Sequence, residues 1–124
     1  IPIEKQNMER LTYTDNYYDI VHCVNALDHT KHPDKAIKEM IRVCKPGGYV
    51  YLRHAEKMGE KQNYMGFHDW NFELFNDTCL IWDRDTTLDL YDIDKRFVSE
   101  LKTEKSNTVY PAEEMVVSIL HKVK

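Results

Sequence analysis

Three side chains capable of acid–base chemistry lie close together in the segment Asp28-His29-Thr30-Lys31-His32. Histidine titrates near neutrality, so His29 is a candidate general base for an acceptor hydroxyl, with Asp28 beside it. Together with His32 these residues also have the side-chain types of a metal site, but an HxxH pair alone does not define one, and we predict no metal. The structural alternative is that Asp28 and His29 form local hydrogen bonds that hold their loop.

A second group of polar and aromatic side chains follows the segment 49–54 and comprises His54, Tyr64, His68 and Trp70. A concave site lined by aromatic side chains is typical of small-molecule binding. We therefore predict that His54, Tyr64 and His68 line the pocket for a small-molecule substrate. For Trp70 and Trp82 the favoured interpretation is packing in the core of a hairpin.

The elements that must position these residues begin with an apolar, β-branched run over residues 17–25, which predicts a strand buried on both faces of a parallel sheet. A helix is predicted from Pro33, with apolar residues at helical spacing and the polar residues Lys35, Lys38, Glu39 and Arg42 on the solvent face. Pro46-Gly47-Gly48 ends it, and a second strand is predicted over 49–54. Strand, helix and strand form a βαβ unit. Ligands of such sheets lie at the carboxyl ends of the strands, here at Cys23, Val24 and Asn25.

The second half of the chain is predicted to be less regular. Two short strands flank Asn76-Asp77 as a hairpin, and apolar residues at near-helical spacing predict a helix within 86–104. Residues 114–123 form a final strand. The loop between the second strand and the hairpin spans 55–69.

The bulk composition limits the class of protein. A chain of 124 residues suffices for one domain with a core, and its net charge of −4 argues against binding nucleic acid through phosphate contacts. No apolar run approaches the roughly 18 residues of a membrane span. The three cysteines, Cys23, Cys44 and Cys79, form neither a disulfide framework nor a zinc pattern, which predicts buried, reduced thiols in a cytoplasmic protein.

Three segments resemble the class I S-adenosylmethionine-dependent methyltransferases of the type 11 group. "NMERLTYTDNYYDIVHCVN" is similar to the acidic-loop segment and fourth strand of that family. "LDHTKHPDKAIKEMIRVCKPGGYVYL" is similar to the next helix, the Pro-Gly-Gly turn and the fifth strand, and "EMVVSILHKV" to the last antiparallel strand. The resemblance implies an α/β fold: a partial Rossmann-like sheet of strands four to seven, with an extra hairpin and helices on its faces.

The resemblance also implies a cofactor, S-adenosylmethionine, and residues that would hold it. Asn7 and the Met8 N–H would meet the edge of the adenine, and the backbone carbonyls of Cys23, Val24 and Asn25 would face the methionine ammonium. In the family the loop of Asp28 and His29 borders the transferring methyl group. The implied activity is methyl transfer to a small-molecule acceptor.

The departures from the family pattern concern the cofactor site. The glycine-rich loop and the acidic residue that grip the cofactor in the family have no counterpart in residues 1–124, which are therefore expected to form a single, partial domain lacking the N-terminal cofactor-binding half. The chain would then act as part of a longer or ancestral enzyme and be inactive alone. The alternative is a non-catalytic fragment that folds or dimerises without cofactor. In either case we expect a homodimer through the open edge of the Tyr18–Asn25 strand.

Overall fold

The structure is a computed structural model that describes residues 4–24, 26–27, 30–56, 70–105 and 114–124. Its elements in chain order are β1 (Tyr18–Val24), α1 (Pro33–Val43), β2 (Cys44–Ala55), β3 (Asn71–Phe75), β4 (Thr78–Trp82), β5 (Thr87–Asp89), α3 (Leu90–Ile93), β6 (Phe97–Lys105) and β7 (Glu114–Lys122).

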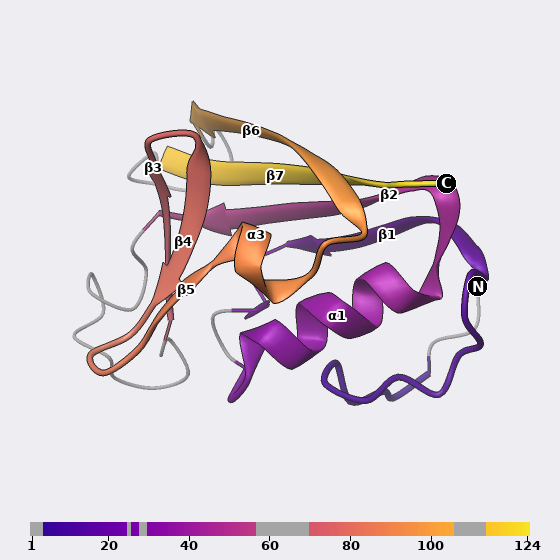
Figure 1. Ribbon diagram of the computed structural model, residues 1–124. Helices are drawn as coiled ribbons and strands as arrows, with labels where there is room; N and C mark the ends of the chain where they lie inside the picture. The colour runs from indigo at the N-terminus through magenta and orange to yellow at the C-terminus, as the bar shows by residue number, and fades with distance from the viewer. Residues whose placement is uncertain (1–3, 25, 28–29, 57–69, 106–113) are drawn as a thin grey trace.

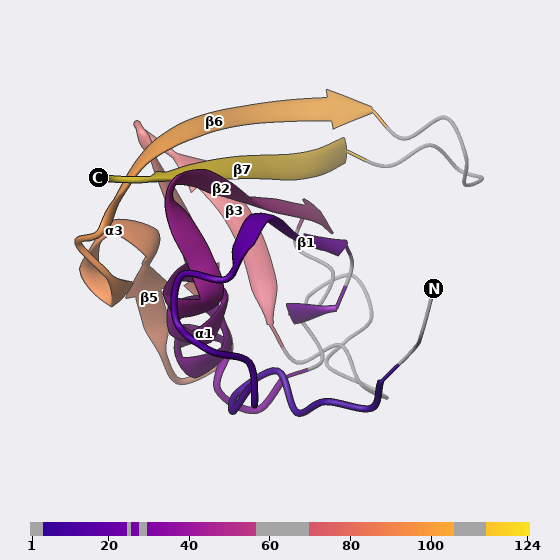
Figure 2. The same ribbon diagram turned by 90° about the vertical axis from the view of Figure 1, so that its right-hand side faces the viewer.

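Four strands form the main sheet in the order β1-β2-β7-β6 (Figure 1 and Figure 2). β1 and β2 are parallel, and β7 runs antiparallel to both of its neighbours, β2 and β6. The predicted βαβ unit and the final antiparallel strand are therefore confirmed. The second sheet, β3-β4-β5, lies beside one end of the main sheet.

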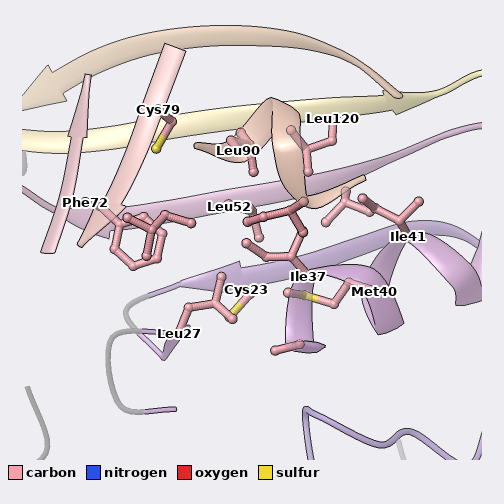
Figure 3. Close-up of a cluster of buried hydrophobic side chains, with 14 of the residues drawn as sticks. Cys23, Leu27, Ile37, Met40, Ile41, Leu52, Phe72, Cys79, Leu90 and Leu120 are labelled. Carbon is pink, nitrogen blue, oxygen red and sulfur yellow. The ribbon is translucent and has the colours of Figure 1, made fainter. Parts of the chain in front are cut away.

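Helix α1 forms where the sequence predicts it, because Pro33 occupies its first turn and Asp34 lies at its positive end. Its apolar side chains, among them Ile37, Met40 and Ile41, point toward the main sheet (Figure 3). They pack with strand residues such as Leu52 in one continuous core. Burying this apolar stripe is what fixes the helix on the sheet.

The Pro-Gly-Gly turn lies inside β2 rather than before it, so the prediction of a strand start at residue 49 is corrected. β2 begins at Cys44, opposite Tyr18, and its regular pairing resumes at Tyr49, opposite Ile20. The residues between them form an irregularity in the ladder, where Gly47 has φ +85°. A bulge therefore joins helix and strand with no separate loop.

β1 is not buried on both faces, contrary to prediction. Only Cys23 is buried, whereas the side chains of Ile20 and Val24 are 53% and 38% exposed. The reason is that β1 lies at the end of the strand order and has a single neighbour among the described strands. The apolar run correctly predicts a strand here. Whether that strand is buried depends on which element lies on the side of β1 away from β2.

The predicted hairpin is confirmed, with β3 and β4 antiparallel around Asn76, which has φ 49°. Trp70 is buried in the core, as predicted, and Trp82 is half-buried. A third strand, β5, extends the hairpin and was not expected. Phe72 and Ile81 face the core that the two sheets share.

The short helix predicted within 86–104 is confirmed only over the four residues of α3, and its predicted continuation is wrong because strand β6 follows. A spacing of four residues, as between Phe97 and Leu101, fits both a helix turn and two steps of a strand. Phe97 is buried while Val98 is 64% exposed, as in the alternation of a strand. Pairing with β7 decides between the two.

Candidate functional site

The N-terminal segment forms a tight turn at the two residues implied in adenine binding. The Asn7 side-chain oxygen accepts a hydrogen bond from the Glu9 N–H at 2.9 Å, and the Asn7 carbonyl accepts from the Arg10 N–H at 3.0 Å. This turn leaves the Met8 side chain packed against the core. Asn7 itself is exposed.

Met8 and Cys23, two of the residues implied in cofactor binding, line one pocket of about 350 Å³. It lies between the N-terminal segment, β1 and α1. Among the described residues its lining is mostly apolar and contains no acidic residue: Met8, Leu11, Tyr13, Tyr18, Ile20, Val21, His22, Cys23, Met40 and Val43. This described lining therefore offers no carboxylate for ribose hydroxyls.

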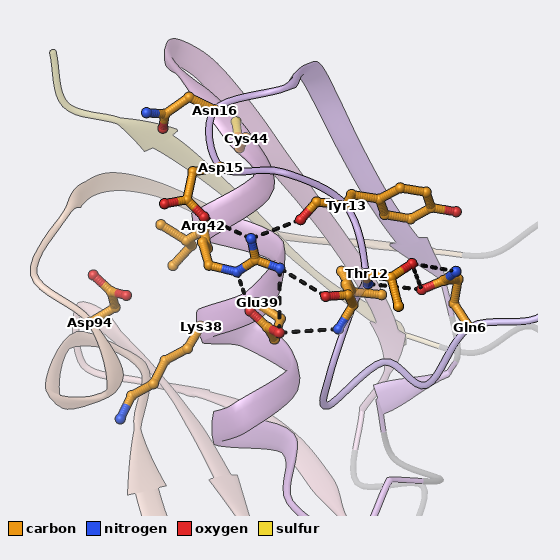
Figure 4. Close-up of polar contacts among 12 residues, drawn as sticks. Gln6, Thr12, Tyr13, Asp15, Asn16, Lys38, Glu39, Arg42, Cys44 and Asp94 are labelled. Atoms are coloured by element: carbon orange, nitrogen blue, oxygen red, sulfur yellow. Dashed lines mark hydrogen bonds and ion pairs between the residues drawn. The ribbon is translucent and has the colours of Figure 1, made fainter.

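Glu39 and Arg42 hold the N-terminal segment against α1 (Figure 4). The Arg42 guanidinium donates to the Tyr13 carbonyl at 2.8 Å and to the Leu11 carbonyl at 3.0 Å. Glu39 accepts from the Leu11 N–H at 3.0 Å. Hydrogen bonds to Glu39 and Asp15 raise the pKa of Arg42, so the guanidinium that holds the N-terminal segment stays charged.

The prediction of a solvated face at Glu39 and Arg42 is thereby corrected. Their side chains are only 20% and 26% exposed. Nothing in the helical spacing distinguishes them from Lys35 and Lys38. A segment distant in the sequence supplies their partners, so the sequence carries no signal for this contact.

Of the remaining predicted site residues, Val24 ends β1 and is partly exposed. Five others lie outside the described residues: Asn25, Asp28, His29, Tyr64 and His68.

His54, predicted to line the substrate pocket, is buried, with an exposed fraction of 1%. Its Nε2 accepts a hydrogen bond from the Leu27 N–H at 3.1 Å, and its ring stacks on Phe72. In this structure His54 contacts the loop after β1, and its role toward a substrate stays a prediction.

Cys23, Cys44 and Cys79 are buried thiols, as the sequence predicts. Burial raises the pKa of Cys79 to about 12 and also raises the pKa of Cys44. Both thiols are therefore held in the protonated, unreactive form near neutral pH. Within the described residues no three potential metal ligands gather, and no helix has the length and apolar character needed to cross a bilayer.

Residues 1–52 match the family described as "Methyltransferase domain". Among curated proteins, the chain is 38% identical over 58 residues to the ubiquinone/menaquinone biosynthesis C-methyltransferase UbiE of Chromobacterium violaceum, covering 47% of this chain and 24% of that protein. The UbiE protein of Burkholderia mallei is 42% identical over 52 residues, which cover 42% of this chain and 21% of the relative.

Solved structures support the fold. The putative methyltransferase in complex with the Trm112 activator of Haloferax volcanii aligns with a TM-score of 0.65 at 13% identity, over 95% of this chain and 60% of that one. An S-adenosylmethionine-dependent methyltransferase from Thermotoga maritima, described as a possible histamine N-methyltransferase, aligns with a TM-score of 0.61 at 18% identity, over 98% and 64% of the two chains.

The architecture is thus that of the Rossmann-like, class I methyltransferases. Residues 1–52 are similar in sequence to a methyltransferase domain, and the fold is similar to that of solved S-adenosylmethionine-dependent methyltransferases. The chain spans about a quarter of the length of the curated relatives it matches.

Proposed function

We propose that this chain contributes part of the site of an enzyme that transfers a methyl group from S-adenosylmethionine to a small-molecule acceptor. The observation that carries the proposal is the pocket shared by Met8 and Cys23, because two residues implied by the resemblance meet there in space. The UbiE relatives are C-methyltransferases of ubiquinone and menaquinone biosynthesis, which supports a small organic acceptor.

The bound cofactor would supply an electrophilic methyl group, and the residues of this chain would position it. The apolar pocket would exclude water from the adenine, whose edge the turn at Asn7 and Met8 would meet. Backbone carbonyls from Cys23 to Asn25 would face the ammonium group. Where the acceptor is a hydroxyl, His29 would remove its proton as the oxygen attacks the methyl group in line.

Binding of S-adenosylhomocysteine tests this proposal by calorimetry on the purified chain. We expect saturable binding that falls at least about tenfold in Met8→Lys, because a charge in the apolar pocket is costly to desolvate. Val98→Lys is the matched control, since Val98 is 64% exposed on β6 and lines no part of that pocket. Equal binding by both variants would contradict the assignment of this pocket.

The second candidate function, a non-catalytic fragment that dimerises without cofactor, is favoured by the open side of β1. Ile20 and Val24 are exposed on a strand that ends the sheet order. An edge of this kind pairs readily with another strand, so a second copy is the expected occupant. Absence of S-adenosylhomocysteine binding by a dimer would support this candidate over the enzyme.

We expect sedimentation at micromolar concentration to show a homodimer joined along β1. The double variant Ile20→Lys/Val24→Lys should be monomeric, because lysines on an edge strand oppose pairing. Val98→Lys again serves as the control and should remain a dimer. A monomeric unmodified chain would refute the interface.

The location and the range of partners also remain predictions. The buried thiols of the three cysteines support a reducing, cytoplasmic compartment. The net charge of −4 supports a small-molecule rather than a nucleic-acid partner.

A further inference from the structure

Three tyrosine rings and one carboxylate line a second hollow, which lies between the N-terminal segment and the start of β1. The hollow has a volume of about 350 Å³, and its described lining is Glu4, Thr12, Tyr13, Thr14, Tyr17 and Tyr18. Tyr13 and Tyr18 also line the pocket proposed for the cofactor, whereas Glu4 and Tyr17 are not among the described residues of that pocket. The second hollow is therefore distinct from the site of the proposed function, although the two share a wall.

The three tyrosine rings of the hollow meet edge to face. The ring centroids of Tyr13 and Tyr18 are 5.4 Å apart with planes at 90°, and those of Tyr17 and Tyr18 are 4.8 Å apart with planes at 75°. The face of an aromatic ring carries negative electrostatic potential, which attracts a cation within about 6 Å of the ring centroid. Rings set at steep angles to one another let one cation contact more than one ring face.

The only charge in the described lining of the hollow is negative. Glu4 supplies it, and its side chain accepts a hydrogen bond from the Tyr13 hydroxyl at 3.1 Å. Thr12 and Thr14 add hydroxyl groups without charge. The net charge of −4 of the whole chain acts in the same direction, so the hollow attracts cations and disfavours anions.

Hydrogen bonds to the end of α1 hold two of the three tyrosines in place. The Tyr13 carbonyl accepts from the Arg42 guanidinium at 2.8 Å, and the Tyr13 ring points away from that arginine (Figure 4). The Tyr17 N–H donates to the Val43 carbonyl at 2.8 Å. A site whose walls are already fixed loses less conformational entropy when a ligand binds.

We propose that this hollow binds a small methylated ammonium ion, with the rings of Tyr13, Tyr17 and Tyr18 against its methyl groups and Glu4 balancing its charge. Quaternary ammonium groups are the ligands that sites of several aromatic faces recognise. A primary ammonium is a compact, strongly hydrated charge, so its transfer from water to the ring faces costs more. The hollow therefore selects a cation whose charge is spread over methyl groups.

Choline is the probe, and nuclear magnetic resonance of the tyrosine ring protons of the purified chain measures its binding. The control ligand is the neutral isostere of choline, in which a tert-butyl group replaces the trimethylammonium group, so the shape is kept and the charge is removed. We expect saturable binding of choline in the millimolar range, because each cation–π contact at an exposed site contributes little. The isostere should bind at least about tenfold more weakly.

The variants change two side chains that lie outside both the core and the cofactor pocket. Tyr17 is 60% exposed, and Tyr17→Leu should lower the affinity for choline about three- to fivefold, whereas Tyr17→Phe keeps the ring face and should retain it. Glu4→Gln should lower the affinity about threefold, and less at high salt. Tyr91→Leu is the matched control, because Tyr91 is 37% exposed and is not part of the described lining of the hollow.

A loss of choline affinity in Tyr17→Leu and Glu4→Gln, but not in Tyr91→Leu, would support the site. The proposal is overturned if the parent chain does not bind choline, if the isostere binds equally well, or if Tyr17→Leu binds as tightly as Tyr91→Leu. The denaturation midpoint of each variant is recorded alongside, so that a loss of fold is distinguished from a loss of binding. These titrations use no S-adenosylhomocysteine, so their outcome is independent of the test of the proposed function.

Discussion

Replacing Gly48 by alanine is expected to lower the free energy of unfolding by about 3 kcal/mol or more. A Cβ atom at this position would lie 2.4 Å from the Asp19 carbonyl oxygen and 3.0 Å from the Lys45 carbonyl oxygen. Both obstacles are backbone atoms, so no side-chain rotation relieves the overlap. β1 would have to separate from β2 at the bulge, and chemical denaturation measures the loss.

Gly47 provides the matched comparison, because its constraint is of another kind. Its φ of +85° is unfavourable for side-chain-bearing residues, but the nearest obstacle to a Cβ is the flexible Lys124 side chain, at 3.0 Å. Gly47→Ala should therefore cost about 1–2 kcal/mol, and Gly47→Asn less, since asparagine tolerates positive φ. A Gly48→Ala protein as stable as Gly47→Ala would contradict the close approach of β1 and β2.

Replacing Lys122 by methionine is expected to lower the free energy of unfolding by about 2 kcal/mol. The Lys122 ammonium is buried and donates to the Ile41 and Cys44 carbonyls, both at 2.8 Å, and to the Asn16 side-chain oxygen at 2.7 Å. These groups lie at the carboxyl end of α1 and its junction with β2. Methionine keeps most of the length of the side chain and removes every donor.

The control for Lys122 is Lys45→Met, which removes an exposed lysine that pairs with Asp19 at 3.5 Å. Exposed pairs of this kind contribute at most about 1 kcal/mol, so this variant should stay close to the parent. Equal stability of the two methionine variants, compared by their denaturation midpoints, would show that Lys122 does not cap the helix.

The stability of the protein should also depend on pH through Lys122. Desolvation, followed by the charge of Arg96, lowers the pKa of Lys122 below its ordinary value of 10.5. Between the lowered folded-state pKa and 10.5, the unfolded chain binds more protons than the folded one. The Lys122 contribution to the unfolding free energy therefore rises with pH in that interval, and Lys122→Met should lack it in denaturation series across alkaline pH.

Local patterns in the sequence were sufficient for the elements that carry the family resemblance. Pro33 and the apolar spacing after it defined α1, and Asn76-Asp77 defined the hairpin turn. The resemblance also named Met8 and Cys23, which the structure brings into one pocket. These features depend on nearby residues or on a family pattern, so the sequence carries them directly.

Other features could not be predicted because they arise from contacts between distant segments. The spacing of Phe97 and Leu101 fits a helix and a strand equally, and only pairing with β7 makes β6 a strand. The spacing of Glu39 and Arg42 is typical of a solvent-exposed helix face. In the folded chain, however, residues 11–15 lie against them and form hydrogen bonds with them. A side chain forms its contacts with the groups that lie beside it in the folded chain, and the local sequence pattern does not identify those groups.

The sequence by itself determined the βαβ unit, the Pro-Gly-Gly turn and the resemblance to a methyltransferase family. Only the tertiary structure decided that Lys122 caps α1, that His54 and Trp70 form hydrogen bonds with Leu27 and Thr30, and that β1 has a single neighbour among the described strands. The physical reason is that local geometry follows from backbone and side-chain preferences within a few residues. Burial, capping and positioning depend on which distant groups the completed sheet brings within hydrogen-bond distance.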